Sequence, residues 1–389
     1  MRDHPDPSRY SLVMPHLGTK IMNMDPEERA RVMERASSAL HDGRAVVLPT
    51  DTLYGVFVSA RGDGPELLDT ITGHPALENQ PRMTLHLADP EPAREHLELG
   101  SAVGRRLVER LLPGPARLVI EQPEHAIESL RGALGIDPGV IDDGRSVALR
   151  VPDHPIARRV IRDSEVPCVA RRIGAASWAV GENPGTDLSP LPEAPDPAPE
   201  VVIDDGATHY ERGSTTVRID AGGRLEVEQG GALEERDVMA NLERTALFVC
   251  TGNTCRSPMA EGIARDMLSR GAPDGITTRV ASAGITAAED MPPTDEAVEV
   301  MRERGIDISD HRSRALTPAM VDEAEIVYTM TPSHAQSVMT LAPNSVHKVH
   351  VLDEREGVPD PVGQDIGVYR ETAERLKTLV EQRLKEIRV

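Results

Sequence analysis

A cysteine and an arginine lie close together at the start of a predicted helix. Five residues separate Cys250 from Arg256 in the run Ala246-Leu-Phe-Val-Cys-Thr-Gly-Asn-Thr-Cys-Arg-Ser-Pro258. Its apolar beginning is typical of a short buried strand, and Pro258 favours the first turn of a helix. A strand, a small loop and a helix start direct successive backbone N–H groups into one hollow of anion size. A thiol and a guanidinium around that hollow are the groups needed to attack a phosphate monoester.

The residues of this loop have separate chemical uses. A cysteine is a nucleophile as its thiolate, which a helix N-terminus and a nearby guanidinium both favour at Cys250. Arg256 can hold two phosphate oxygens at once. Ser257 can donate a hydrogen bond to the thiolate, and Asn253 suits bracing the loop because asparagine tolerates left-handed backbone and bonds locally.

The leaving group of such a reaction needs a proton, and a carboxylic acid on a long loop could supply it. Asp360 is the candidate, because Pro361 fixes the chain beside it and the surrounding residues lack a helix or strand pattern. Asp-Pro pairs are also common in plain turns, which is the alternative for this residue. His311, His334 and His347 show no metal-ligand spacing, so we interpret them as surface or packing residues and expect no metal site.

The composition indicates a globular protein with room for two domains. The chain has 389 residues, and a domain commonly uses about 100–200. The formal net charge of −21 argues against broad binding of nucleic acids or acidic membranes, although it leaves room for a local basic pocket. No apolar run approaches the length of a membrane span, and the N-terminus lacks a signal-peptide pattern. Three cysteines are too few for a disulfide framework, so we expect a cytoplasmic protein with no membrane partner.

The order of predicted strands and helices differs between two parts of the chain. Residues 1–24 are predicted to form a loosely held arm. In 25–243 strands and helices alternate without regular spacing, which predicts an α+β or open α/β domain. In 245–389 each predicted strand is followed by a helix, which predicts a parallel sheet covered on both faces. Ligand chemistry then belongs at the carboxyl ends of the strands, where Cys250 lies.

The individual elements follow from apolar runs, caps and breakers. In the first domain we predict strands at 44–49, 85–87, 117–120, 145–151, 166–170, 201–204 and 215–219, helices at 26–40, 91–112 and 156–162, and a strand and a helix within 225–242. In the second we predict strands at 246–249, 277–282, 326–329 and 346–352, and helices at 258–270, 295–304, 317–322, 333–341 and from 366. Residues 182–200 contain six prolines and are predicted to form an extended surface loop.

The run from Val249 to Glu261 resembles the signature of the low-molecular-weight protein phosphatase family. Ser282-Ala-Gly284, Gly305-Ile-Asp307, Met330-Thr331 and Asp360-Pro361 continue the resemblance in the family's order, over essentially all of 245–389. It implies a four-stranded parallel sheet flanked by helices, with Cys250 forming a phosphocysteine, Arg256 clamping phosphate, and Asp360 acting as acid and then base. It also implies a phosphorylated protein substrate, no metal or organic cofactor, and a phosphate-binding loop made of Thr251, Gly252, Asn253, Thr254, Cys255 and Ser257.

Thr254 bears on the choice of substrate. Many members of the family carry a bulkier aliphatic residue there, whereas threonine resembles the branch of bacterial protein-arginine phosphatases. The stretch Ile285-Thr-Ala-Ala288 also lacks a large aromatic residue that could stack on phosphotyrosine. We therefore favour phosphoarginine and keep phosphotyrosine as the close alternative. Cys255 has two possible roles: it fills space in the loop, or it forms a reversible disulfide with Cys250.

The first domain resembles a second family. Val46-Val-Leu-Pro-Thr-Asp-Thr-Leu-Tyr-Gly55 looks like the opening motif of the YrdC-like family, and 112–115, 147–154 and 213–217 continue it over about 26–240. The resemblance implies a twisted α/β sheet around a basic cavity. Family members use ATP, threonine and bicarbonate to make threonylcarbamoyl-adenylate for tRNA modification, and some bind double-stranded RNA. It therefore implies an ATP/Mg or RNA site, with pocket residues Thr50, Asp51, Tyr54, Arg150 and Ser214.

Several positions depart from the YrdC-like pattern. The family's Lys-x-Arg cluster falls near Thr72-Gly73-His74, and its Ser-Ala-Asn segment falls at Ala170-Arg-Arg-Ile173. The threonine expected after Pro-Gly-Pro is displaced by Ala116-Arg117. Arg82, Arg150, Arg171 and Arg172 could rebuild a basic pocket. We expect the fold with a ligand-sensing or docking role; the alternative is a threonylcarbamoyladenylate synthase or RNA-binding protein. Thr50 and Asp51 have a plainer interpretation, as a turn that caps its own backbone.

Overall fold

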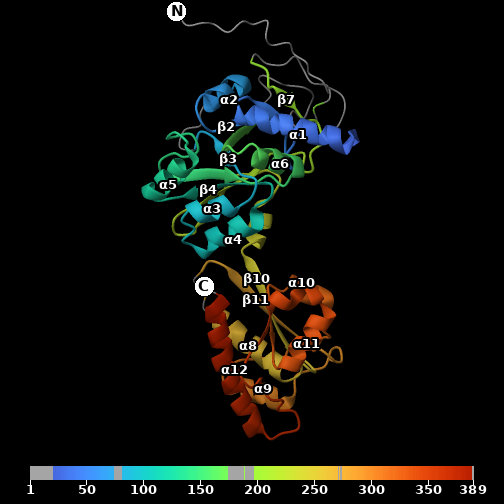
Figure 1. The fold of residues 1–389 in the computed structure, drawn as a ribbon. Coiled ribbons are helices and arrows are strands. Elements are labelled where there is room, and N and C mark those ends of the chain that lie inside the picture. Colours follow the sequence, from blue (N-terminus) through green and yellow to red (C-terminus); the bar gives the residue numbers. More distant parts are fainter. Residues whose placement is uncertain are drawn as a thin grey trace, which may run out of the picture. The chain divides into compact units, whose positions relative to one another are not determined.

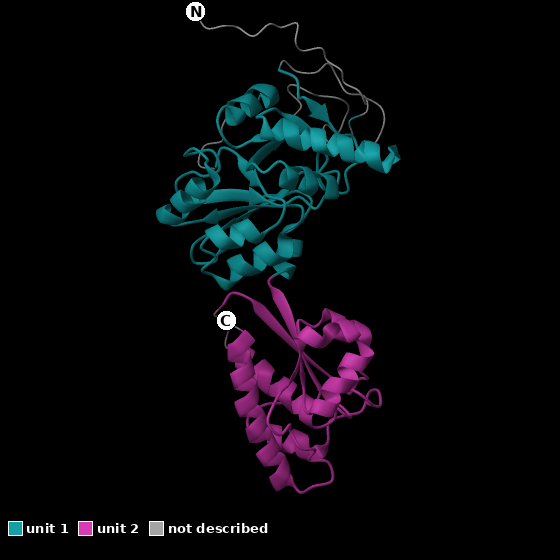
Figure 2. Ribbon diagram, in the orientation of Figure 1, with its two compact units in different colours: residues 1–241 teal, residues 242–389 magenta. Residues whose placement is uncertain are grey.

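The computed structural model describes residues 21–73, 81–173, 188, 197–269, 271 and 274–387. The chain divides into two compact units, Met1–Asn241 and Leu242–Val389 (Figure 2). Most of the predicted arm (1–24) and most of the predicted loop (182–200) lie outside the described residues. Within the described part, no helix is both long and apolar enough to cross a bilayer.

The N-terminal unit is built on one mixed nine-stranded sheet with the order β7-β1-β2-β6-β3-β5-β4-β8-β9 (Figure 1). The pairs β1–β7, β3–β5 and β4–β8 are parallel, and the other neighbours are antiparallel. The strands are β1 (Val46–Leu48), β2 (Gly55–Ser59), β3 (Thr84–His86), β4 (Ala116–Glu121), β5 (Ser146–Arg150), β6 (Cys168–Arg172), β7 (Val201–Val202), β8 (Thr215–Ile219) and β9 (Leu225–Gln229).

The helices of this unit are α1 (Pro26–His41), α2 (Gly64–Thr72), α3 (Glu91–His96), α4 (Ala102–Leu111), α5 (Glu124–Leu134), α6 (Pro155–Asp163) and α7 (Glu235–Ala240). Asp25 caps α1 as its sequence predicts, accepting from the backbone of Glu27 and Glu28 at 2.9 Å. Residues 91–112, which the sequence predicts as mostly helix, form two helices, α3 and α4. Leu97 is extended and Ser101 caps a second helix by accepting from the Gly104 N–H at 2.9 Å.

The C-terminal unit is an α/β fold whose four-stranded sheet is entirely parallel, in the order β11-β10-β12-β13. This confirms the predicted fold class. The strands are β10 (Glu243–Cys250), β11 (Thr277–Gly284), β12 (Ile326–Thr329) and β13 (Val349–Val351). The helices are α8 (Arg256–Leu268), α9 (Asp295–Arg302), α10 (Pro318–Glu323), α11 (Pro332–Leu341) and α12 (Ile366–Ile387).

Both faces of this sheet are covered, because successive side chains of a strand point to opposite sides. Phe248 and Cys250 belong to a core packed with α8, α9 and α12, whereas Leu247 and Val249 belong to a second core beside α10 and α11. Figure 1 shows these two sets of helices on opposite sides of the strands.

The last predicted strand is shorter than expected. Residues Pro343–Lys348 form a 3-10 helix, which the Ser345 hydroxyl ties to the Ala342 carbonyl at 2.6 Å. The proline that begins this helix and the serine bond favour a tight turn over an extended backbone, so only Val349–Val351 remains in the sheet.

Candidate active site

Cys250 lies at the carboxyl end of the central strand β10, and α8 begins six residues later at Arg256. Its sulfur receives the backbone N–H of Asn253 at 3.2 Å and lies 3.0 Å from the Ser257 hydroxyl. Because the Asn253 amide donates to that hydroxyl oxygen at 2.9 Å, the Ser257 proton is available to the sulfur. The Asn253 N–H, the Ser257 hydroxyl and the N-terminus of α8 thus surround the thiol.

Asn253 braces the loop from inside. It is fully buried and has a left-handed backbone with φ 55°, which asparagine adopts more easily than most residues. Its amide also donates to the Ser282 hydroxyl at 2.9 Å, and its side-chain oxygen accepts the Arg314 N–H at 3.0 Å. This one side chain therefore joins the loop to Ser282 and Arg314, which lie 29 and 61 positions further along the chain.

Gly284 lets β11 come close to the same loop. A Cβ at this position would lie 2.6 Å from the Thr251 carbonyl oxygen and 2.9 Å from the Asn253 nitrogen. Since real Cβ atoms essentially never approach backbone so closely, a larger residue would push the loop out of place.

Arg256 extends from the first position of α8 beneath the loop. Its guanidinium donates to the Val358 carbonyl at 3.1 Å and to the Thr251 hydroxyl at 3.3 Å, and forms an ion pair with Asp360. The arginine is buried, and its Nε has no hydrogen-bond partner among the described residues. The candidate phosphate clamp and the candidate acid are thus brought together across 104 positions of sequence.

Two histidines at the site were missed as functional candidates by the sequence interpretation. The His334 Nε2 lies 2.9 Å from the Thr251 hydroxyl, and the His311 Nε2 lies 2.9 Å from the Asn253 carbonyl. Burial lowers the pKa of both imidazoles, and for His334 the Arg256 charge lowers it further while Asp360 acts in the opposite sense. His347, in contrast, is exposed.

A positional signal for one of these histidines was present in the sequence. His334 comes shortly after the end of β12, and the carboxyl ends of parallel strands meet at one edge, whereas His311 follows helix α9 and had no such signal.

Thr254 and Cys255 are the last two residues of the loop before α8, and Cys255 is buried. The Cys255 thiol contacts the hydroxyls of Thr294 at 3.5 Å and Tyr369 at 3.6 Å, and both loop cysteines are free thiols. Burial raises the pKa of the Tyr369 phenol to about 12. The Thr254 side chain is half-buried, with its carbonyl held by the Thr294 N–H at 3.0 Å. No group of three or more His, Cys, Asp or Glu side chains that could hold a metal occurs in the described part of the chain.

Comparison with known proteins places this site in a family. The family model described as "Low molecular weight phosphotyrosine protein phosphatase" matches residues 245–389. A protein-arginine-phosphatase of Bacillus subtilis is 35% identical over 147 residues, which cover 36% of this chain and 95% of that protein. The chain belongs to the low molecular weight protein phosphatases. The enzyme is therefore a protein phosphatase.

Other relatives of the phosphatase unit carry different names. A probable low molecular weight protein-tyrosine-phosphatase, EpsP, of Ralstonia nicotianae is 35% identical, covering 37% of this chain and 97% of that protein. An arsenate reductase of Staphylococcus haemolyticus is 33% identical, covering 36% and 95%. A crystal structure of a low molecular weight protein tyrosine phosphatase from T. tengcongensis is 40% identical, covers 37% of this chain and 99% of that chain, and has a TM-score of 0.35.

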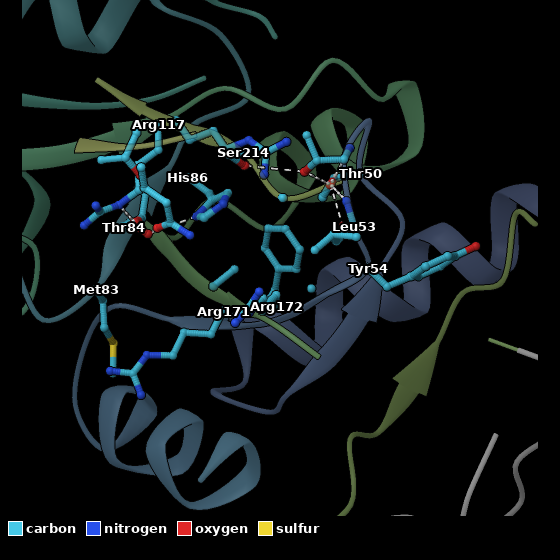
Figure 3. A pocket seen from close by; sticks show the side chains of 18 of the residues that line it. Thr50, Leu53, Tyr54, Met83, Thr84, His86, Arg117, Arg171, Arg172 and Ser214 are labelled. Atoms are coloured by element: carbon cyan, nitrogen blue, oxygen red, sulfur yellow. Dashed lines mark hydrogen bonds between the residues drawn. The ribbon is translucent and has the colours of Figure 1, made fainter. Parts of the chain in front are cut away.

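The phosphatase carries a YrdC-like domain ahead of it. A family model described as "Telomere recombination" (Sua5, YciO, YrdC) matches residues 38–229. This unit contains a cavity of about 440 Å³ (Figure 3). Four predicted pocket residues, Thr50, Tyr54, Arg150 and Ser214, line it, and so do Arg82, Arg171 and Arg172. Arg117 and His86 also border it, and burial lowers their pKa values to about 10 and about 3.

Carboxylates outside the cavity wall hold several of these arginines. Asp69 forms ion pairs with both Arg82 and Arg171. Asp51 accepts from the Arg150 guanidinium at 2.6 Å, and both members of this pair are buried. Within the described residues, the second Asp51 oxygen and the Arg150 Nε have no hydrogen-bond partner. Asp69 and Asp51 therefore compensate part of the positive charge that lines the cavity.

Of the predicted pocket residues, Asp51 does not line the cavity, whereas Tyr54 lines it. The Asp51 carboxylate is buried against Arg150. The Tyr54 side chain extends away from the other labelled side chains in Figure 3, and its hydroxyl donates to the Gly206 carbonyl at 2.7 Å. Thr50 caps its own turn, accepting the Thr52 and Leu53 N–H groups at 3.2 Å, so its plainer interpretation describes the contacts it makes.

Proposed function

We propose that the phosphatase unit is cysteine-dependent and works through a phosphocysteine intermediate. The observation that carries this proposal is the pair of donors on the Cys250 sulfur, from Asn253 and Ser257, at the N-terminus of α8. Such an environment keeps a thiolate available and supplies a donor again when that thiolate leaves.

The reaction has two steps. In the first, the Cys250 thiolate attacks phosphorus, a sulfur–phosphorus bond forms, and the bond from phosphorus to the leaving oxygen or nitrogen breaks. The leaving group takes a proton from Asp360. In the second, water attacks the phosphocysteine and gives its proton to the Asp360 carboxylate, which releases phosphate and restores the thiolate. Arg256 holds the equatorial oxygens in both steps.

Arg256 has to exchange one anionic partner for another during this cycle. Asp360 and the Thr251 hydroxyl both accept from Nη2 of the guanidinium, while the Val358 carbonyl accepts from Nη1. An incoming phosphate replaces the carboxylate there and frees it to accept or deliver a proton.

For the substrate we favour a protein phosphorylated on arginine, with phosphotyrosine as the alternative. Thr254 is half-buried at the edge of the loop, and small residues follow β11 where an aromatic wall could stand. The relatives include enzymes named for each activity. Three free cysteines agree with a reducing, cytoplasmic setting.

The proposal is tested by hydrolysis of a generic aryl phosphate with the full-length protein, its Cys250→Ser variant, and a chelator. We expect turnover in the wild type, no turnover in the variant, and no effect of the chelator. Activity that survives in Cys250→Ser, or that the chelator removes, would contradict the proposal.

We propose an accessory, ligand-sensing role for the YrdC-like unit. ATP with magnesium, which the family implies, does not fit the residues present. Asp69 and Asp51 already engage three arginines, Arg82, Arg171 and Arg150, that a triphosphate would need for charge compensation. Titration calorimetry with Mg-ATP and threonine should give weak or no binding. Tight binding with formation of threonylcarbamoyl-adenylate would establish the alternative function instead.

A further inference from the structure

His334 lies in the first turn of α11, close to the point where β12 ends. Thr331 caps this helix and accepts from the His334 backbone N–H at 3.4 Å. The imidazole is only 8% exposed and points back toward the phosphate-binding loop rather than along the helix surface. None of the steps proposed above uses it.

The His334 ring connects two hydroxyls on opposite sides. Its Nδ1 lies 2.8 Å from the Thr331 hydroxyl, and its Nε2 lies 2.9 Å from the Thr251 hydroxyl. Arg256 donates to that same Thr251 oxygen at 3.3 Å. A continuous series of hydrogen bonds therefore runs from the cap of α11 through His334 and Thr251 to the guanidinium.

Burial and the charges around the ring both act on the pKa of the His334 imidazole. The charged groups that face it are Arg256 from α8 and Asp360 from the loop before α12. Burial and the Arg256 charge both oppose a second proton. A neutral imidazole has one donor and one acceptor. Because Arg256 can only donate to Thr251, the Thr251 hydroxyl can donate to Nε2 while Nδ1 donates to the Thr331 hydroxyl.

The same cap also supports the loop that carries Asp360. The Val358 N–H donates to the Met330 carbonyl at 2.7 Å. A Cβ at Gly357, whose φ is +69°, would lie 3.2 Å from that carbonyl oxygen. The backbone around Thr331 is thus packed against the acid loop while His334 reaches the phosphate-binding loop.

We propose that His334 is a positioning residue that orients the Arg256 guanidinium for phosphate by fixing the Thr251 hydroxyl. This inference rests on the proposed phosphatase site and adds to it a residue that does not touch the substrate. When the imidazole is removed, Thr251 can rotate and Arg256 keeps only its Val358 and Asp360 contacts.

Two amide substitutions separate the two sides of the ring. In His334→Asn the amide occupies the region of Nδ1, so the Thr331 contact is kept and Thr251 is out of reach. In His334→Gln the longer side chain reaches the region of Nε2 and restores the Thr251 contact. We expect the inhibition constant for inorganic phosphate to rise about tenfold in His334→Asn, the scale of one hydrogen bond to a charged group, and less than about threefold in His334→Gln.

The loop side provides an independent test. Thr251→Val removes the hydroxyl at constant shape and should weaken phosphate about as much as His334→Asn, whereas Thr251→Ser should stay near wild type. Because His334 acts through Thr251, the double variant Thr251→Val/His334→Asn should be no weaker than Thr251→Val alone. His347→Asn, at an exposed histidine of the same unit, is the matched control.

Each outcome decides the proposal. Equal losses in the Asn and Gln variants, or losses that add in the double variant, would show a merely structural role and overturn it. Phosphate binding to the full-length variants is also measured by calorimetry, and thermal melts report whether each one folds. If the wild type shows no Cys250-dependent turnover, the proposed function fails, while the binding series still tests the arrangement of His334, Thr251 and Arg256.

Discussion

Arg256 and Asp360 form an ion pair in which the arginine side chain is 4% exposed and the carboxylate side chain is 46% exposed. Among the described residues, the charged partner of this buried guanidinium thus lies at the solvent side. The carboxylate can swing into water at little cost, whereas the guanidinium stays where its Val358 and Thr251 contacts hold it. This asymmetry suits a site in which a dianion enters from solvent and replaces the carboxylate.

The ion pair predicts opposite effects of Asp360→Asn on turnover and on phosphate binding. Loss of the acid should lower kcat by about 10²- to 10⁴-fold. The neutral amide competes less well for Arg256, so phosphate should inhibit severalfold more tightly. Steady-state kinetics with phenyl phosphate and with p-nitrophenyl phosphate check this, since the better leaving group should lose less. Weaker phosphate inhibition in the variant would contradict it.

Asn253 should matter for both its backbone and its side chain. Asn253→Ala removes the amide from Ser257 and Ser282 and places alanine at φ 55°. We expect a loss of unfolding free energy of about 2–4 kcal/mol, from unpaired buried groups and left-handed strain together.

Asn253→Gly is the matched control, because glycine accepts this backbone. It should recover part of the stability and little of the activity. Urea unfolding and aryl phosphate hydrolysis measure the two effects, and equal stability of the Ala and Gly variants would exclude a contribution from backbone strain.

The YrdC-like unit should lose stability in mild acid because of His86. Burial lowers the pKa of this imidazole from 6.5 to about 3 in the folded state. Between these values the unfolded chain binds more protons, so the free energy of unfolding rises with pH and falls as pH drops below about 6.5. The slope for one such group is at most about 1.4 kcal/mol per pH unit.

His86→Asn keeps an amide near the Thr84 carbonyl, which the imidazole Nδ1 meets at 2.9 Å, and it cannot be protonated. Urea unfolding of the full chain from pH 7 to pH 4.5 should therefore be less steep in pH for His86→Asn than for the wild type. His209→Asn, at an exposed histidine, should leave the slope unchanged. Parallel curves for wild type and His86→Asn would contradict the assignment.

Thr254 should influence the choice between two phosphorylated residues. Thr254→Ile replaces a hydroxyl at the edge of the loop with apolar bulk. We expect the ratio of rates on phosphoarginine and phosphotyrosine to shift toward phosphotyrosine by about tenfold, the effect of roughly one lost hydrogen bond. Thr254→Ser should keep the wild-type ratio. An unchanged ratio in Thr254→Ile would remove Thr254 from the specificity argument.

The elements nearest the site could be predicted because their signals are local. An apolar run before Cys250 and Pro258 after it were enough to place a strand, a loop and a helix start. Helix α5 was missed although Pro123 precedes it and Gly135, with φ 66°, ends it; both are standard boundary signals.

The contacts that complete the site could not be derived from spacing. Asn253 meets Arg314, and Thr251 meets His334, across 61 and 83 positions of sequence. Such pairings depend on the order of strands in the sheet, which no local pattern encodes. The same holds for Tyr54, whose side chain turns toward Gly206 only because of how the N-terminal sheet is folded.

The membership of Cys250 in the core of α8, α9 and α12 has a consequence for heat inactivation. The sulfur that is expected to react belongs to the same cluster as Phe248, Met259 and Leu376, which are at most 1% exposed. Loosening of that cluster displaces the nucleophile before any surface loop needs to melt. We therefore expect the phosphatase activity and the packed core of this unit to be lost over the same range of temperature.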